Sequence, residues 1–194
     1  MRNAQRYAVL SAVALLAACG GGDKKSVTGP DGNLNGSFTA TMSGDIAGPL
    51  SGLAGHAAVS TGPVDEQGFV LAFEDTPSNG TATASIIIAR KNPALPATGQ
   101  IAFKSSDDDD FGPNDYVMLA AVADAQGTNW LCVSSGGSMT VSASSAARIR
   151  GTISITASCI TAGSEVEKAI TLSGNFDSRQ ETVPQLRAGF AMMR

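Results

Sequence analysis

The sequence predicts an all-β protein: an antiparallel β-sandwich or a jelly-roll-like barrel of about eight to ten strands, behind a signal peptide and a flexible tether. Apolar and polar residues alternate with a period of two along most of the chain after residue 35, as in strands with one buried face. The 22 Gly and 8 Pro punctuate these runs, where turns are expected. No stretch carries the apolar stripe of an amphipathic helix.

Residues 1–18 have the composition of an export signal. Arg2 and Arg6 form a positive segment with no acidic residue to offset them. Residues 7–18 (YAVLSAVALLAA) are apolar, and this run of about a dozen residues is short of the roughly 20 that span a bilayer. The segment therefore predicts a cleaved signal peptide.

The signal ends in Leu16-Ala17-Ala18-Cys19, which resembles the lipobox of bacterial lipoproteins. The resemblance implies that Cys19 receives a diacylglyceryl group, that cleavage falls between Ala18 and Cys19, and that the new amino group is then acylated. Gly20 in place of Asp favours the outer membrane in the sorting pattern of that family. The alternative is an ordinary signal in which Cys19 has no role.

Residues 19–35 predict a tether, and residues 36–194 a single β domain. The tether is rich in Gly, Asp and Asn, has no apolar period, and would span roughly 20 to 25 Å as a coil. Loss of residues 1–18 removes two Arg and no acid, so the formal charge of −4 becomes −6. This acidic balance argues against nucleic acid. The expected partner is membrane lipid, through acylated Cys19.

The clearest strand patterns keep their apolar residues on one phase. They lie at 38–42, 69–73, 101–103, 139–143, 148–157 and 166–176. Residues 85–89 and 116–123 are apolar on both phases and indicate central strands, although a short helix also fits the second run. Gly136-Gly137 predicts a tight hairpin between residues 130–134 and 138–143.

Two segments near the C-terminus carry a second resemblance. Residues 150–157 (RGTISITA) and 170–177 (ITLSGNFD) are similar to paired strands of small, uncharacterised bacterial lipoproteins and secreted β domains. Ile153 and Ile155 stand where aromatic residues are common in that pattern. The resemblance implies a β-sandwich and no assigned chemistry.

Cys132 and Cys159 remain once Cys19 is assigned to lipid. Disulfides persist outside the cytoplasm, and Cys159 continues the predicted core phase of its strand. We expect a disulfide that closes a loop of about 28 residues and contributes roughly 3 to 3.5 kcal/mol. Two buried free thiols are the alternative.

The acidic stretch DDDDFGPNDY provides oxygen ligands that suit Ca²⁺, with Asp107, Asp109 and Asp115 as candidates. Its spacing is not that of an EF-hand, and neighbouring Asp side chains point in different directions. A solvated acidic loop with no ion, and hence no cofactor, is the interpretation that we favour.

His56, the single histidine, is expected on the surface or in a loop rather than as a general base. Trp130, the single tryptophan, shares a strand phase with Cys132 and is expected to pack on the disulfide instead of stacking on a sugar. No Gly-x-Ser-x-Gly, HExxH or P-loop motif occurs.

Together these patterns favour a non-enzymatic, membrane-anchored lipoprotein of the cell envelope with a binding or structural role. One alternative is a hydrolase of envelope glycans or lipids that uses Glu74 with Asp75 or Asp109. Another is a carbohydrate-binding module that uses Ca²⁺ and the acidic loop.

Overall fold

The structure, a computed structural model, describes residues 36–59, 67–76, 82–105, 111–161 and 166–180. The predicted signal peptide, Cys19 and the tether lie outside this part of the chain. The described residues contain no helix that could cross a membrane.

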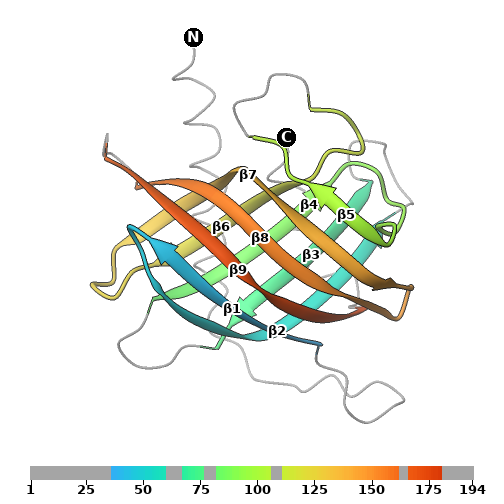
Figure 1. Cartoon of the computed structure of the whole chain (residues 1–194), viewed down its shortest axis with the longest axis horizontal. Coiled ribbons are helices and arrows are strands. Elements are labelled where there is room, and N and C mark those ends of the chain that lie inside the picture. The colour runs from blue at the N-terminus through green and yellow to red at the C-terminus, as the bar shows by residue number, and fades with distance from the viewer. Residues whose placement is uncertain (1–35, 60–66, 77–81, 106–110, 162–165, 181–194) are drawn as a thin grey trace.

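The described residues form nine β-strands, and no helix lies among them. Figure 1 shows the strands as a strongly twisted layer that curves away from the viewer. In chain order they are β1 (Gly36–Gly44), β2 (Gly48–Val59), β3 (Gly68–Asp75), β4 (Thr83–Arg90), β5 (Gly99–Ala102), β6 (Val117–Ala123), β7 (Asn129–Ser144), β8 (Arg148–Ile160) and β9 (Glu167–Gln180).

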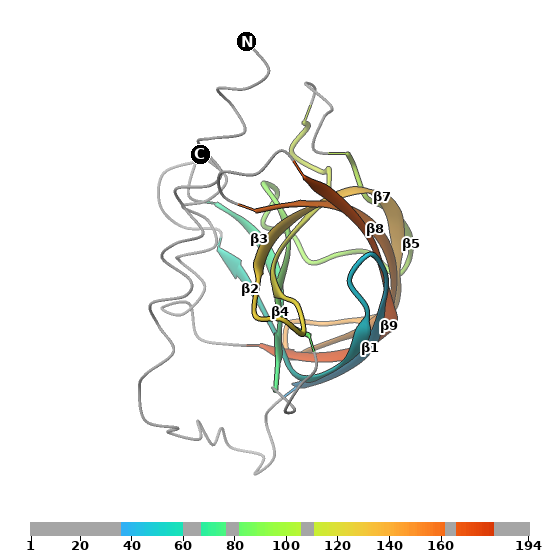
Figure 2. The same cartoon turned by 90° about the vertical axis from the view of Figure 1, so that its left-hand side faces the viewer.

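Eight of the strands close into one antiparallel barrel. With β5 set aside, each strand pairs with the next along the chain, and β1 pairs with β9, for example Phe38 with Phe176. Figure 2 shows the resulting ring. The short strand β5 pairs with the second half of β7, beyond the part of β7 that pairs with β6. The prediction of an all-β, barrel-like fold is confirmed, and the described strands belong to a single sheet instead of the two that a sandwich requires.

The barrel interior is filled by one apolar core. Phe38 and Met42 of β1, Phe73 of β3 and Ile153 and Ile155 of β8 point inward and are buried, as their sequence phases predict. The rings of Phe38 and Phe73 lie 5.2 Å apart, centroid to centroid. Side chains, and not a wide lumen, therefore occupy the centre of this eight-stranded barrel.

The outer wall is apolar on one side. Ala57, Val70 and Ala89 lie side by side across β2, β3 and β4, point away from the core and are almost completely buried. Ile87 of β4 lies in the neighbouring row, opposite Leu119 of β6. These outward residues explain why residues 85–89 and 116–123 are apolar on both phases.

The predicted hairpin at Gly136-Gly137 is wrong, because both flanking segments belong to the continuous strand β7. From Leu131 to Ser144, β7 pairs with β8, and the register shifts between Ser134 and Gly136. This β-bulge adds one residue, so Cys132 and Met139 both point inward although their sequence phases differ. Gly137 has a φ of 105°, and a Cβ there would lie 2.2 Å from the carbonyl oxygen of Ser154. The β-bulge, and not a turn, therefore requires glycine at this position.

Candidate functional site at the polar end of the barrel

The two ends of the barrel interior differ in chemistry. Because neighbouring strands are antiparallel, β2, β4, β7 and β9 all finish at one end. We call this the polar end because five polar side chains lie there that are buried or point inward. They are His56, Arg90, Tyr116, Ser144 and Ser178. The opposite end, which contains Asp124, Trp130, Lys168 and the two cysteines, is called the disulfide end.

His56 lies inside the polar end, and the expectation of a surface or loop position was wrong. The side chain is 1% exposed because β2 points Leu50, Ala54 and His56 inward, whereas Leu53 lies on the outer wall and is 43% exposed. The sequence pattern was misleading because the outward phase of β2 also contains a buried apolar residue. Ala57 belongs to the buried apolar cluster on the outside of the barrel.

The imidazole of His56 has a partner for each ring nitrogen. Nε2 lies 3.0 Å from the carbonyl oxygen of Ala146, and Nδ1 lies 2.9 Å from Oγ of Ser178. A carbonyl only accepts, so Nε2 carries a proton. In the neutral ring Nδ1 is an acceptor, and the single hydroxyl proton of Ser178 is then shared between Nδ1 and the carbonyl oxygen of Ile149. Burial lowers the pKa of His56, and the hydrogen bond to the Ala146 carbonyl opposes that effect in part.

This His–Ser pair links strands of the barrel and lacks the orienting carboxylate of a catalytic triad among the described residues. Ser178 is fully buried, and its hydroxyl lies against the His56 ring and the carbonyl oxygen of Ile149. Among the described residues no carboxylate bonds to the ring, and Nε2 is held by a backbone carbonyl instead. The Ser178 hydroxyl also lies 3.2 Å from the carbonyl oxygen of Ile149, which links β2, β8 and β9.

Arg90 and Tyr116 form the second pair at the polar end. Arg90 continues the inward phase of Ile86 and Ile88 and is 8% exposed, and its guanidinium carbon lies 4.9 Å from the centroid of the Tyr116 ring. Nη2 of Arg90 donates to the carbonyl oxygen of Ala94. Burial raises the pKa of Tyr116 to about 12, and the positive charge of Arg90 counteracts part of that rise. Tyr116 is therefore a protonated donor at neutral pH.

Three buried polar side-chain atoms of the described residues lack a hydrogen-bond partner, and all three lie at the polar end. They are Nε of Arg90, the hydroxyl oxygen of Tyr116 and Oγ of Ser144. Most buried polar atoms in folded proteins are paired, so a group of exceptions at one end of a core is notable.

The segments that flank Arg90 and Tyr116 are tied to each other. The backbone N–H of Asn92 donates to the carbonyl of Pro113 over 2.8 Å, and its side-chain amide donates to Oδ1 of Asn114 over 2.7 Å. Lys104 N–H donates to the carbonyl of Tyr116 over 2.9 Å. These bonds fix the positions of Arg90 and Tyr116 at the end of the barrel.

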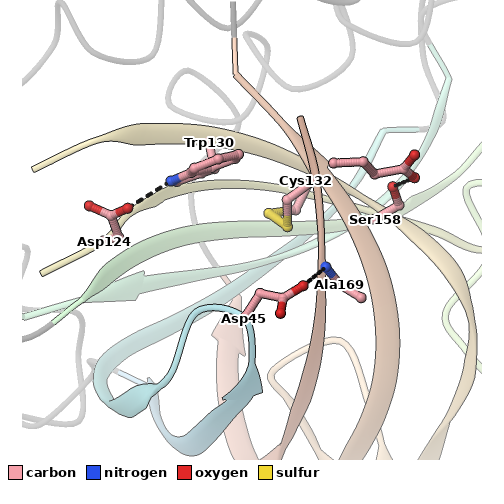
Figure 3. Close-up of a disulfide and its surroundings, with 8 residues drawn as sticks. Asp45, Asp124, Trp130, Cys132, Ser158 and Ala169 are labelled. Atoms are coloured by element: carbon pink, nitrogen blue, oxygen red, sulfur yellow. Dashed lines mark hydrogen bonds between the residues drawn. A yellow bond between two sulfur atoms is a disulfide. The ribbon is translucent and has the colours of Figure 1, made fainter. Parts of the chain in front are cut away.

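At the disulfide end, the polar groups of Trp130, Asp124 and Lys168 are paired with one another or with the backbone. Figure 3 shows the bond between Trp130 and Asp124. Trp130 Nε1–H donates to Oδ2 of Asp124 over 2.9 Å, and Lys168 Nζ lies 3.7 Å from the same oxygen and 4.2 Å from the indole centroid. Oδ1 of Asp124 accepts the backbone N–H groups of Gln126 and Thr128. The bond from Trp130 is the main cause of a lowered pKa for Asp124.

The predicted disulfide is confirmed. Cys132 and Cys159 stand directly opposite each other on β7 and β8, bonded at 2.05 Å. Trp130 is 6% exposed and belongs to the apolar core of the barrel, which agrees with the core position predicted for it.

The acidic candidates do not form a site in the described residues. The Asp115 carboxylate accepts the Gly112 N–H over 2.8 Å and lies 4.0 Å from Lys104 Nζ, so it stabilises its own turn. Asp107 and Asp109 lie outside the described residues. No group of three or more His, Cys, Asp or Glu with metal-binding geometry occurs in the described part of the chain.

The carboxylates of the hydrolase alternative do not converge either. Glu74 and Asp75 are consecutive in β3 and therefore point to opposite sides of the sheet. Asp75 accepts the backbone N–H of Ser51 over 2.8 Å, whereas Glu74 is exposed on the outer wall. Their possible partner Asp109 lies outside the described residues.

No protein-family model, curated protein or solved structure matches this chain. The resemblances drawn from residues 16–19 and from residues 150–177 therefore remain predictions.

Sequence reasoning missed the polar end, although it contains a usable signal. Arg90 directly follows the run at 85–89, and strict alternation from Ile86 and Ile88 places its side chain in the core. An arginine on the inward phase of a central strand is rare and needs a partner. That pattern was sufficient to select Arg90 as a candidate.

Proposed function

We propose that this protein is a lipoprotein of the cell envelope, anchored through acylated Cys19, whose barrel is a non-enzymatic binding module. The observation that carries the proposal is the sequence Leu16-Ala17-Ala18-Cys19 at the end of a signal-like segment. Two or three acyl chains would provide a durable anchor, since each buried methylene contributes about 0.8 kcal/mol. Gly20 favours the outer membrane as the destination.

The barrel supports the proposed compartment. A disulfide between neighbouring strands is stable in the oxidising space beyond the cytoplasmic membrane, and the outward residues of β1 and β8 are mostly Thr and Ser. The polar end supports binding rather than catalysis. Its unpaired groups include two hydrogen-bond donors, Arg90 and Tyr116, whereas hydrolysis of glycans needs two facing carboxylates.

Labelling with an alkyne analogue of palmitate in a bacterial host tests the anchor. We expect the full chain to be labelled and to fractionate with membranes, and Cys19→Ser to lose the label. The matched control is Cys132→Ser with Cys159→Ser, which keeps Cys19 and should keep the label. An unlabelled wild-type chain, or a labelled Cys19→Ser variant, would contradict the proposal.

A further inference from the structure

Arg90 carries a permanent charge into the barrel without an acidic partner in the described residues. The ion pairs of these residues are Lys104–Asp115, Arg148–Asp177, Arg150–Asp177 and Lys168–Asp124, and none includes Arg90. A guanidinium that is 8% exposed gives up most of its hydration. Such a charge is costly unless an opposite charge or several hydrogen bonds compensate for it.

The contacts that the protein provides satisfy only part of Arg90. The ring of Tyr116 covers one face of the guanidinium, and the Ala94 carbonyl accepts from Nη2, but Nε–H has no acceptor. The hydroxyl of Tyr116 is buried and equally without a partner. Two adjacent side chains thus each have one buried donor without an acceptor among the described residues.

The chemistry of these groups selects the kind of ligand. A guanidinium only donates hydrogen bonds, and a tyrosine whose pKa is raised stays protonated and donates as well. A metal ion would find no free acceptor in His56, since one ring nitrogen faces the Ala146 carbonyl and the other the Ser178 hydroxyl. An anionic oxygen complements both the charge and the two donors.

We propose that Arg90 and Tyr116 bind an anionic oxygen, the carboxylate or phosphate group of a small ligand, at the polar end of the barrel. This deepens the binding part of the proposed function and does not depend on the lipid anchor. The two proposals are tested by different measurements. Acylation of Cys19 is tested by incorporation of the palmitate analogue, and anion binding is tested by titration of the folded barrel.

The test titrates the purified full chain, in a low-salt buffer, with sodium acetate, sodium phosphate or sodium chloride in separate experiments. The Nε–Hε resonance of Arg90 in ¹H–¹⁵N spectra and the midpoint of thermal unfolding are followed. We expect one of the two oxyanions to shift the Arg90 resonance in a saturable manner and to raise the midpoint. Response to acetate alone assigns a carboxylate, and response to phosphate alone assigns a phosphate.

Three variants separate a binding site from a structural pair. Tyr116→Phe retains the ring and should weaken binding about tenfold, as for a lost hydrogen bond to a charged group. Arg90→Lys retains the positive charge but lacks the Nε–H group, and it should weaken anion binding at least as much as Tyr116→Phe does. Arg150→Lys, on the exposed outer wall, should bind as the wild type does. An Arg90 resonance unmoved by 50 mM acetate or phosphate, an equal response to chloride, or undiminished binding in Tyr116→Phe would each overturn the proposal.

Discussion

The disulfide end and the polar end close the same barrel by different means. At the disulfide end, Asp124 satisfies the indole of Trp130 and two backbone N–H groups, and Cys132 is cross-linked to Cys159. At the polar end, the buried groups are more numerous and some are unpaired. The polar groups named at the disulfide end therefore bond to one another or to the backbone. The polar end, in contrast, contains buried donors that have no hydrogen-bond partner among the described residues.

The largest expected effect is on the disulfide end. In Cys132→Ala with Cys159→Ala, the free energy of unfolding should fall by about 3 kcal/mol, because the cross-link joins residues separated by 27 positions and restricts the unfolded chain. Urea unfolding followed by Trp130 fluorescence measures the change. Cys19→Ala serves as the control and should leave barrel stability unaltered. A loss below about 1 kcal/mol in the double variant would show that the disulfide is not a main support of this end.

A matched pair of substitutions compares the ends directly. Trp130→Phe removes a buried donor that is paired with Asp124, so stability should fall by about 1 to 3 kcal/mol. Tyr116→Phe removes a buried hydroxyl that has no partner, so stability should be unchanged or rise by up to about 1 kcal/mol. Urea unfolding followed by circular dichroism suits both variants, because one lacks the only tryptophan. Equal losses in the two variants would show that the Tyr116 hydroxyl is paired after all.

A smaller effect concerns pH. Burial lowers the pKa of His56 in the folded barrel below its ordinary value of 6.5, so the unfolded chain binds the proton more tightly. This contribution to stability is complete above pH 6.5 and is lost as the pH falls toward the folded pKa. Urea unfolding at pH 7.5 and 5.5 measures it, and His56→Gln should remove the difference, since the chain has no other histidine. A wild-type barrel that is as stable at pH 5.5 as at 7.5 would contradict this prediction.

The strand patterns were predictable because they depend on local alternation. β1 and β8 bury the phases that the sequence indicates, and Cys132 and Cys159 meet because both belong to inward phases. The closure of the barrel was not predictable, since pairing of β1 with β9 joins residues between 126 (Gly44 and Ile170) and 140 (Ser37 and Asp177) positions apart and leaves no local pattern. The bulge in β7 was also hidden, because two adjacent glycines are a stronger signal for a turn.

The polar end was harder to predict for a different reason. His56 lies on a strand whose outward phase is also apolar, so alternation alone selects the wrong face. The contact of Arg90 with Tyr116 depends on how β4 and β6 are placed in register, with Ala89 opposite Val117. Register is a property of the whole sheet and could not be read from either segment.

The pairing of the first strand with the last also sets an order of events during synthesis. Until Phe176 and its neighbours in β9 have left the ribosome, β1 has no partner on one side and the sheet keeps two open edges. The pairing of β1 with β9 closes the barrel, and it is the most distant strand pairing among the described residues. For the export that we propose, the consequence would be that the barrel cannot close before its last strand has been made.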